Sequence, residues 1–97
     1  MRLLMICLDA AFQADAKTLL SMPNLGGLAD RGVFCQNVQT SYPSLTYPIH
    51  TSIITGCYPD KHGIPHNEKY APDMPAAKRA WHWDVQDIQV PTLHQAA

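Results

Sequence analysis

Residues 41–50 bring several hydroxyl groups to the start of an expected helix. Thr46 stands directly before this helix, and Pro48 lies in its first turn. Free backbone N–H groups and the positive end of the helix dipole gather at such a place and favour a phosphate or sulfate dianion. A threonine hydroxyl becomes a nucleophile when a neighbouring group masks its proton, as a divalent metal ion can. Thr46 is therefore a candidate nucleophile at an anion site.

Asp9 is the second residue whose type and position suit this chemistry. It follows an apolar run at the point where an open α/β sheet places its ligands, the carboxyl end of a strand. A carboxylate there is a candidate metal ligand close to the helix that follows Thr46. Each residue also has an ordinary explanation, Thr46 as a helix N-cap and Asp9 as a turn or cap residue. The residues alone leave both explanations open.

The elements that must position these two residues alternate between strand and helix. Residues 2–8 are continuously apolar after Arg2, which is typical of a strand covered on both faces in a parallel sheet. Residues 23–31 predict a short helix with Gly32 at its C′ position, and residues 33–39 alternate like a half-buried strand.

Farther along the chain, residues 48–55 predict a helix that Gly56 closes. Residues 57–80 contain four prolines and predict an ordered surface loop. At the end of the chain, Pro91 and Thr92 have the character of a helix start, so we expect the 97 residues to be truncated within a single domain. The fold class is α/β, with a mostly parallel sheet flanked by helices and incomplete in this chain.

Composition limits the partners of this protein. Hydrophobic residues make up 46% of the chain and charged residues 15%, which predicts a folded globular protein. The formal net charge of −1 predicts no nucleic-acid partner, and the lack of an apolar run of about 20 residues predicts no membrane partner. With no leader recognised, the expected location is cytoplasmic. Three cysteines without a CxxC pair, Cys7, Cys35 and Cys57, predict buried thiols in a reducing compartment.

Three stretches together resemble the N-terminal part of a type I phosphodiesterase/nucleotide pyrophosphatase, a family of the alkaline phosphatase superfamily. They are Asp9 after its strand, residues 22–33, and residues 46–64 with the elements TxPxH and TGxYPxxHG. The resemblance implies that Asp9 binds one of two zinc ions. It implies that Thr46 also contacts metal and is the nucleophile, phosphorylated during hydrolysis of a phosphodiester or pyrophosphate bond in a small-molecule phosphate ester. Residues 1–97 would be the N-terminal portion of the catalytic domain.

The resemblance gives other motif positions a supporting role, and these are His50, Gly56, Tyr58, Pro59, His62 and Gly63. His62 is expected either to orient its loop through hydrogen bonds or to pack as a structural histidine. Asn67 fits the polar end of the motif without an assigned role, and the substrate-binding residues stay unassigned. The resemblance also implies an amide donor to a phosphate oxygen, expected at the position of Ile49, whose side chain has none. Another group would have to donate there, or the substrate differs.

The metal site implied by the resemblance is incomplete in this sequence. A catalytic zinc site needs about three protein ligands, whereas the chain offers Asp9 and Thr46. His62 and His66 are four residues apart, but the Gly63 and Pro65 between them disfavour a shared helix face. The chain alone is therefore expected to be inactive.

Other functions stay open beside this one. A non-catalytic truncated remnant is one, and hydrolysis of phosphonates, phosphomonoesters or sulfate esters within the same superfamily is another. For a sulfatase, Leu45 stands where an arginine is required. The run Trp81-His82-Trp83 could form a base-stacking surface, but we expect the two tryptophans to serve packing, because tryptophan chiefly buries area.

Overall fold

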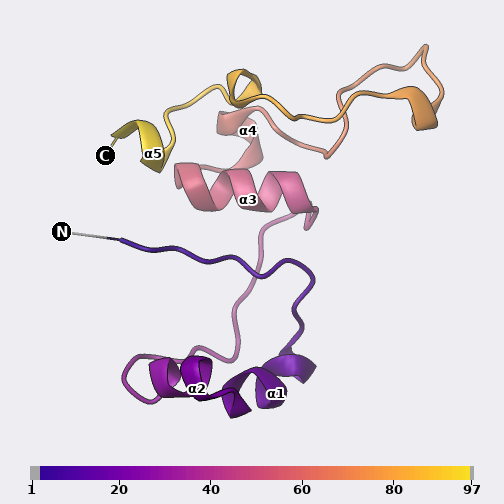
Figure 1. Cartoon of the computed structure of the whole chain (residues 1–97). Coiled ribbons are helices and arrows are strands. Elements are labelled where there is room, and N and C mark those ends of the chain that lie inside the picture. The colour runs from indigo at the N-terminus through magenta and orange to yellow at the C-terminus, as the bar shows by residue number, and fades with distance from the viewer. Residues whose placement is uncertain (1–2, 97) are drawn as a thin grey trace. The chain divides into compact units, whose positions relative to one another are not determined.

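The computed structural model describes residues 3–96, and the chain divides into two compact units, residues 1–39 and 40–97 (Figure 1). Each unit is considered by itself. Within the described residues, regular structure is almost entirely helical, and an isolated antiparallel bridge pairs Glu68 with Trp81. None of the helices among these residues is long and apolar enough to cross a membrane.

Unit 1 contains a short 3-10 helix, η1 (Gln13–Asp15), followed by α1 (Ala16–Ser21) and α2 (Pro23–Ala29). The α2 helix confirms the prediction for residues 23–31, although it ends two residues earlier. Gly32 was expected to close the helix, but it does not adopt a left-handed φ. The C-cap of α2 is Asp30 instead, which has a right-handed φ of −62°. The N–H of Asp30 donates to the carbonyl oxygen of Gly26.

Gly26 allows α1 and α2 to approach each other. A Cβ atom at this position would collide with the carbonyl oxygen of Leu20. A Cβ on the neighbouring Gly27 would meet no atom within 4 Å. Glycine at position 26 lowers the helix propensity of α2, but the close approach of α1 requires a residue without a side chain there. Position 27 has no such requirement.

The two segments predicted as strands, residues 3–8 and 33–39, carry no regular secondary structure, and their side chains are exposed. A parallel strand gains its hydrogen bonds only from neighbouring strands. The α/β class and its sheet therefore stay a prediction. The prediction of buried thiols is wrong for Cys7 and Cys35, which are exposed because no layer of the described unit 1 covers these segments. Cys57 is half-buried.

Unit 2 is organised around α3 (Thr46–Thr55), which contacts α4 (Pro59–His62) and α5 (Leu93–Ala96). Gly56 ends α3 with a left-handed φ of 67°, as predicted, and its N–H donates to the carbonyl of Ser52 at 2.8 Å. The last helix is also confirmed: the side-chain oxygen of Gln95 accepts the N–H of Thr92 at 2.8 Å.

The core of unit 2 is small and lies between these helices. His62 and Ile64 are 0% and 1% exposed, and Pro48 on α3 is also fully buried. The threonines Thr51 and Thr92 are buried at 7% and 4% exposure.

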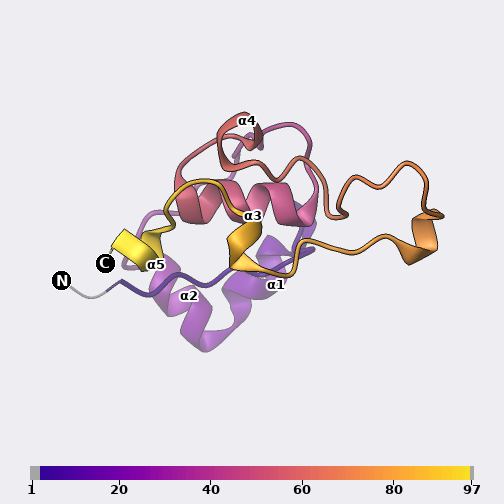
Figure 2. The same cartoon turned by 90° about the horizontal axis from the view of Figure 1, so that it is seen from above.

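Residues 57–80 were predicted as one surface loop, and this is only partly right. The segment contains α4 and the 3-10 helix η2 (Ala76–Lys78), and a second 3-10 helix, η3 (Val85–Asp87), follows it. Both views show the part around η2 extending away from α3 (Figures 1 and 2). Residues 67–69 and 80–82 pair at the base of this extension, and we call these two arms the clasp.

Candidate functional site

Thr46 is the first residue of α3 and is half-buried. The helix begins two residues earlier than predicted, because the carbonyl of Leu45 accepts the N–H of Ile49 at 3.1 Å. Leu45 has the extended backbone of an N-cap (φ −100°, ψ 156°), so the N-cap explanation for Thr46 is wrong. The hydroxyl of Thr46 is thus placed at the start of the helix without serving as its cap.

The first turn of α3 offers fewer free N–H groups than a helix start usually does. The Tyr47 N–H donates to Asn67 Oδ1 at 2.9 Å, and Pro48 has no N–H. The Ile49 N–H is used within the helix. Among the described residues this leaves the N–H of Thr46 for an anion, so the expected cluster of free donors reduces to one backbone group beside the hydroxyl.

Asn67 is a residue to which the sequence assigned no role. Its side-chain oxygen must face the Tyr47 N–H, because that group can only donate, and this orientation leaves the Asn67 NH₂ group as a donor beside the start of α3. The amide donor was expected at the position of Ile49, and Asn67 supplies a carboxamide from another element. A polar side chain directly after the His-Gly turn was the available signal, but its partner lies 20 residues away.

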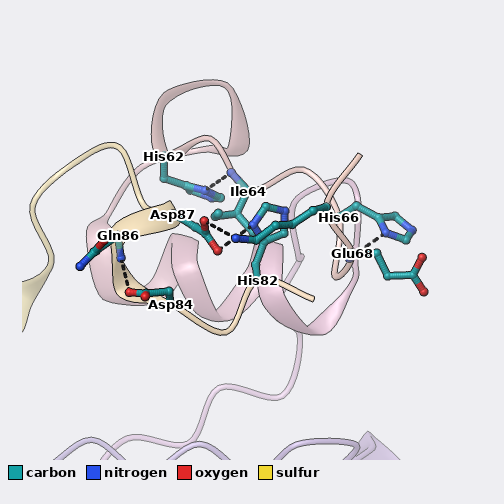
Figure 3. A network of polar contacts seen from close by, with 9 residues as sticks. His62, Ile64, His66, Glu68, His82, Asp84, Gln86 and Asp87 are labelled. Carbon is teal, nitrogen blue, oxygen red and sulfur yellow. Dashed lines mark hydrogen bonds and ion pairs between the residues drawn. The ribbon is translucent and has the colours of Figure 1, made fainter. Parts of the chain in front are cut away.

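His62 ties the loop after α4 to α3, and it is both packed and hydrogen-bonded. Its Nδ1 accepts the N–H of Ile64 at 3.1 Å, so its proton is on Nε2, which donates to Ser52 Oγ at 3.0 Å (Figure 3 shows the first contact). Burial lowers the pKa of His62 below its ordinary value of 6.5, since the charged ring would lose its hydration. A neutral imidazole therefore holds this corner of unit 2.

Two other histidines of unit 2, His50 and His82, have polar contacts through Nδ1. His50 is one turn farther along α3, and its Nδ1 lies 2.9 Å from the carbonyl oxygen of Thr46, so this nitrogen carries the proton in that contact. His82 belongs to the clasp, and its Nδ1 lies 3.3 Å from Asp87 Oδ2. Lys69 Nζ contacts the other oxygen of the same carboxylate at 2.7 Å and holds the pKa of Asp87 below its usual range.

Tyr47, Trp81 and Trp83 form an aromatic cluster beside the start of α3. The two tryptophan rings stack with centroids 5.7 Å apart and planes at 16°, and Tyr47 meets each of them edge-on. Trp83 is nevertheless 78% exposed and Trp81 39%. The expectation that both tryptophans serve packing holds for the contact between them. It is wrong for their burial, because Trp83 is mostly open to solvent. The cluster borders a cavity of about 250 Å³ that His50, His82 and Asp84 also line.

Asp9 lies in an exposed turn of unit 1, and Ala10 after it has a left-handed φ of 57°. Asp9 lies in unit 1 and Thr46 in unit 2. Within residues 3–96, no three side chains of the His, Cys, Asp and Glu types gather as a metal-binding group. The two oxygen donors suit a divalent metal in their chemistry, but the described chain does not complete a ligand set.

The sequence places this chain among enzymes named as pyrophosphatases and phosphodiesterases. It is 41% identical to the mouse ectonucleotide pyrophosphatase/phosphodiesterase family member 1 over 56 residues, which are 58% of this chain and 6% of the relative. It is 42% identical over 69 residues to a pyrophosphatase/phosphodiesterase of Schizosaccharomyces pombe, covering 71% of this chain and 14% of that protein. A bis(5'-adenosyl)-triphosphatase of Xenopus laevis is 36% identical over 72 residues, 74% of this chain and 16% of the relative.

The model of the type I phosphodiesterase / nucleotide pyrophosphatase family matches residues 3–95, and the chain belongs to this family. The resemblance seen in the motifs is thereby confirmed, and the chain is a member of a hydrolase family. The chain matches only a small part of the relatives described above, 6% of the mouse protein's length. No solved structure matches the chain.

Proposed function

We propose that the protein hydrolyses phosphodiester or pyrophosphate bonds of small-molecule phosphate esters, with Thr46 as the nucleophile. Thr46 Oγ would attack phosphorus, and one ester or anhydride oxygen would leave and take up the proton that the hydroxyl gives up. The rest of the phosphate ester would then be bound to Thr46 as a phosphothreonine ester. Water would then attack phosphorus in this intermediate, release a phosphate monoester and regenerate the hydroxyl. The observation that carries this proposal is the placement of a non-capping hydroxyl at the first residue of α3, directly beside the anchored carboxamide of Asn67.

Asn67 and the Thr46 N–H would stabilise the charge that develops on the phosphate oxygens. The Asn67 oxygen is occupied by the Tyr47 N–H, so its NH₂ group is oriented before any substrate arrives. A preoriented donor costs no reorganisation at the moment of reaction, and removal of one such donor costs other enzymes about 2.7–4 kcal/mol of transition-state stabilisation. An amide at position 49 is then unnecessary.

The two metal ions implied by the family, proposed to be zinc, would be held in part by Asp9 and Thr46. When bound, such ions act as Lewis acids toward the phosphate oxygens and the attacking hydroxyl. The donor atoms of Asp9 and Thr46 are compatible with this role, and the remaining ligands would come from protein beyond these 97 residues. We therefore propose that the 97-residue chain alone is inactive.

Replacement of Thr46 by alanine in the whole protein tests this function. We expect Thr46→Ala to lower turnover of a chromogenic phosphodiester at least a thousandfold while thermal unfolding stays unchanged. Ser44→Ala removes a hydroxyl from the exposed neighbouring loop and should retain activity. Rapid acid quenching should trap Thr46 carrying the remaining phosphate ester in the unaltered protein and no such adduct in Thr46→Ala. Full activity of Thr46→Ala would refute the assignment.

A further inference from the structure

The clasp is held together by its backbone before any side chain contributes. The N–H of Lys69 donates to the carbonyl of Ala80 at 2.7 Å, and the N–H of His82 donates to the carbonyl of Asn67 at 3.1 Å. A pairing of two arms this short is marginal by itself in water. Something outside the two arms must therefore keep them in register.

Asp87 contacts both arms of the clasp from η3. One carboxylate oxygen accepts from Lys69 Nζ on the first arm at 2.7 Å, and the other lies 3.3 Å from His82 Nδ1 on the second arm (Figure 3 shows the contact with His82). The side chains of His82 and Asp87 are only 14% and 19% exposed. Neither of the two facing atoms, His82 Nδ1 and Asp87 Oδ2, has a hydrogen-bond partner among the described residues, so each depends on the ion pair with the other. The carboxylate thus bridges the two arms.

The start of η3 holds Asp87 in this position. Asp84 caps η3, since its side chain accepts the N–H of Gln86 at 2.9 Å (Figure 3). The Asp87 N–H donates to the Asp84 carbonyl at 3.0 Å. Asp87 therefore sits on a defined turn, and its side-chain position does not depend on the clasp alone.

The clasp in turn presents Asn67 to α3. The backbone carbonyl of Asn67 is bound by the second arm, through the N–H of His82, while its side-chain oxygen accepts the Tyr47 N–H next to Thr46. The contacts form an unbroken series: Asp87 to the two arms, the arms to Asn67, and Asn67 to the first turn of α3.

We propose that Asp87 is a positioning residue: by bridging Lys69 and His82 it fixes the carboxamide of Asn67 on the first turn of α3 beside Thr46. The positioning itself is independent of catalysis, and only its effect on turnover rests on the proposed function. Small displacements of a positioned donor reduce catalysis steeply. Loss of the bridge should therefore speed the hydrogen exchange of the Tyr47 N–H directly. A lower turnover rate would follow as a consequence.

Hydrogen–deuterium exchange at single-residue resolution in the whole protein measures the positioning directly. In Asp87→Asn we expect the Tyr47 amide to exchange at least tenfold faster, because its acceptor Asn67 is no longer held. The Gly56 amide, bonded to Ser52 at the other end of α3, should change by less than threefold. Asp73→Asn removes the same charge from the exposed loop and should leave both amides unchanged.

Two outcomes would overturn the inference. One is an unchanged exchange rate of the Tyr47 amide in Asp87→Asn. The other is an equal acceleration at Gly56, which would mean that Asp87 only stabilises unit 2 as a whole.

Turnover separates this inference from the proposed function. If both hold, Asp87→Asn lowers kcat at least tenfold and Asp87→Glu restores part of the loss. If Thr46→Ala is fully active, the proposed function fails, while faster exchange of Tyr47 alone in Asp87→Asn would still support the positioning role. If Thr46 proves essential but the Tyr47 amide does not respond, the inference fails and the function stands.

Discussion

The two units of this chain differ in how much of their structure they hold by themselves. No described residue of unit 1 is buried, and its apolar side chains are open to solvent, with Leu4 81% and Val33 91% exposed. Unit 2 fully buries Pro48, His62 and Ile64. The unit that carries the candidate nucleophile therefore has a core of its own, whereas the unit that carries the candidate metal ligand Asp9 does not.

The difference follows from the range of the contacts that each unit needs. Helix α3 obtains its packing from α4 and α5, which follow it within the next 41 residues or fewer. The apolar segments of unit 1 have the composition of central strands, and such strands are stabilised only when a sheet and its helices cover both faces. Whether such layers cover these segments is not tested by the described residues, and the α/β sheet stays a prediction.

The largest expected effect is the loss of the core of unit 2. His62→Ala removes a fully buried ring and leaves the Ser52 hydroxyl and the Ile64 N–H without their partner. We expect the free energy of unfolding to fall by about 2–4 kcal/mol. Urea unfolding followed by the fluorescence of the two tryptophans of unit 2 measures it. His66→Ala, at an exposed histidine, should cost no more than about 0.5 kcal/mol, and equal losses in both variants would break the contrast.

A second test concerns the packing of α1 against α2 in unit 1. Gly26→Ala should destabilise the contact between α1 and α2 by about 1–3 kcal/mol, because its Cβ would meet the Leu20 carbonyl. Gly27→Ala, where a Cβ meets nothing, should stabilise α2 by about 0.5–1 kcal/mol. Thermal unfolding of the two variants gives the comparison. If both variants behave alike, α1 and α2 do not pack as described and unit 1 has even less structure of its own.

The smallest effect is a pH dependence that belongs to unit 2. Because burial lowers the pKa of His62, the unfolded state binds its proton first as the pH falls, so the folded state loses stability below about pH 6.5. One proton changes the free energy of unfolding by at most about 1.4 kcal/mol per pH unit. Urea midpoints of the unaltered protein between pH 7.5 and 5 should fall more steeply than those of His62→Gln. Parallel curves would show that His62 binds its proton equally in the folded and unfolded states.

Short-range signals in the amino-acid sequence were sufficient for α2, α3 and α5, whereas α1 and α4 were not predicted. Pro48 and Gly56 predicted the two ends of α3. Proline is tolerated in the first turn of a helix, and glycine readily adopts the left-handed φ that ends one. The start of α5 after Thr92 was predicted on the same basis. The motifs around Thr46 likewise led to the family, which the match over residues 3–95 confirms. The α/β sheet, the cytoplasmic location and the lack of nucleic-acid or membrane partners stay predictions.

The tertiary structure decided what surrounds Thr46. The Asn67 carboxamide reaches Tyr47 across 20 residues, and Lys69 meets Asp87 across 18, so no local pattern announces either contact. The stacking of Trp81 on Trp83 with an exposed outer ring likewise depends on where the chain turns after η2. Local conformation follows from sterics and backbone hydrogen bonds between near neighbours. The donors around the candidate nucleophile depend on which distant segments pack together. Local sequence patterns do not determine this packing, so only the folded structure shows it.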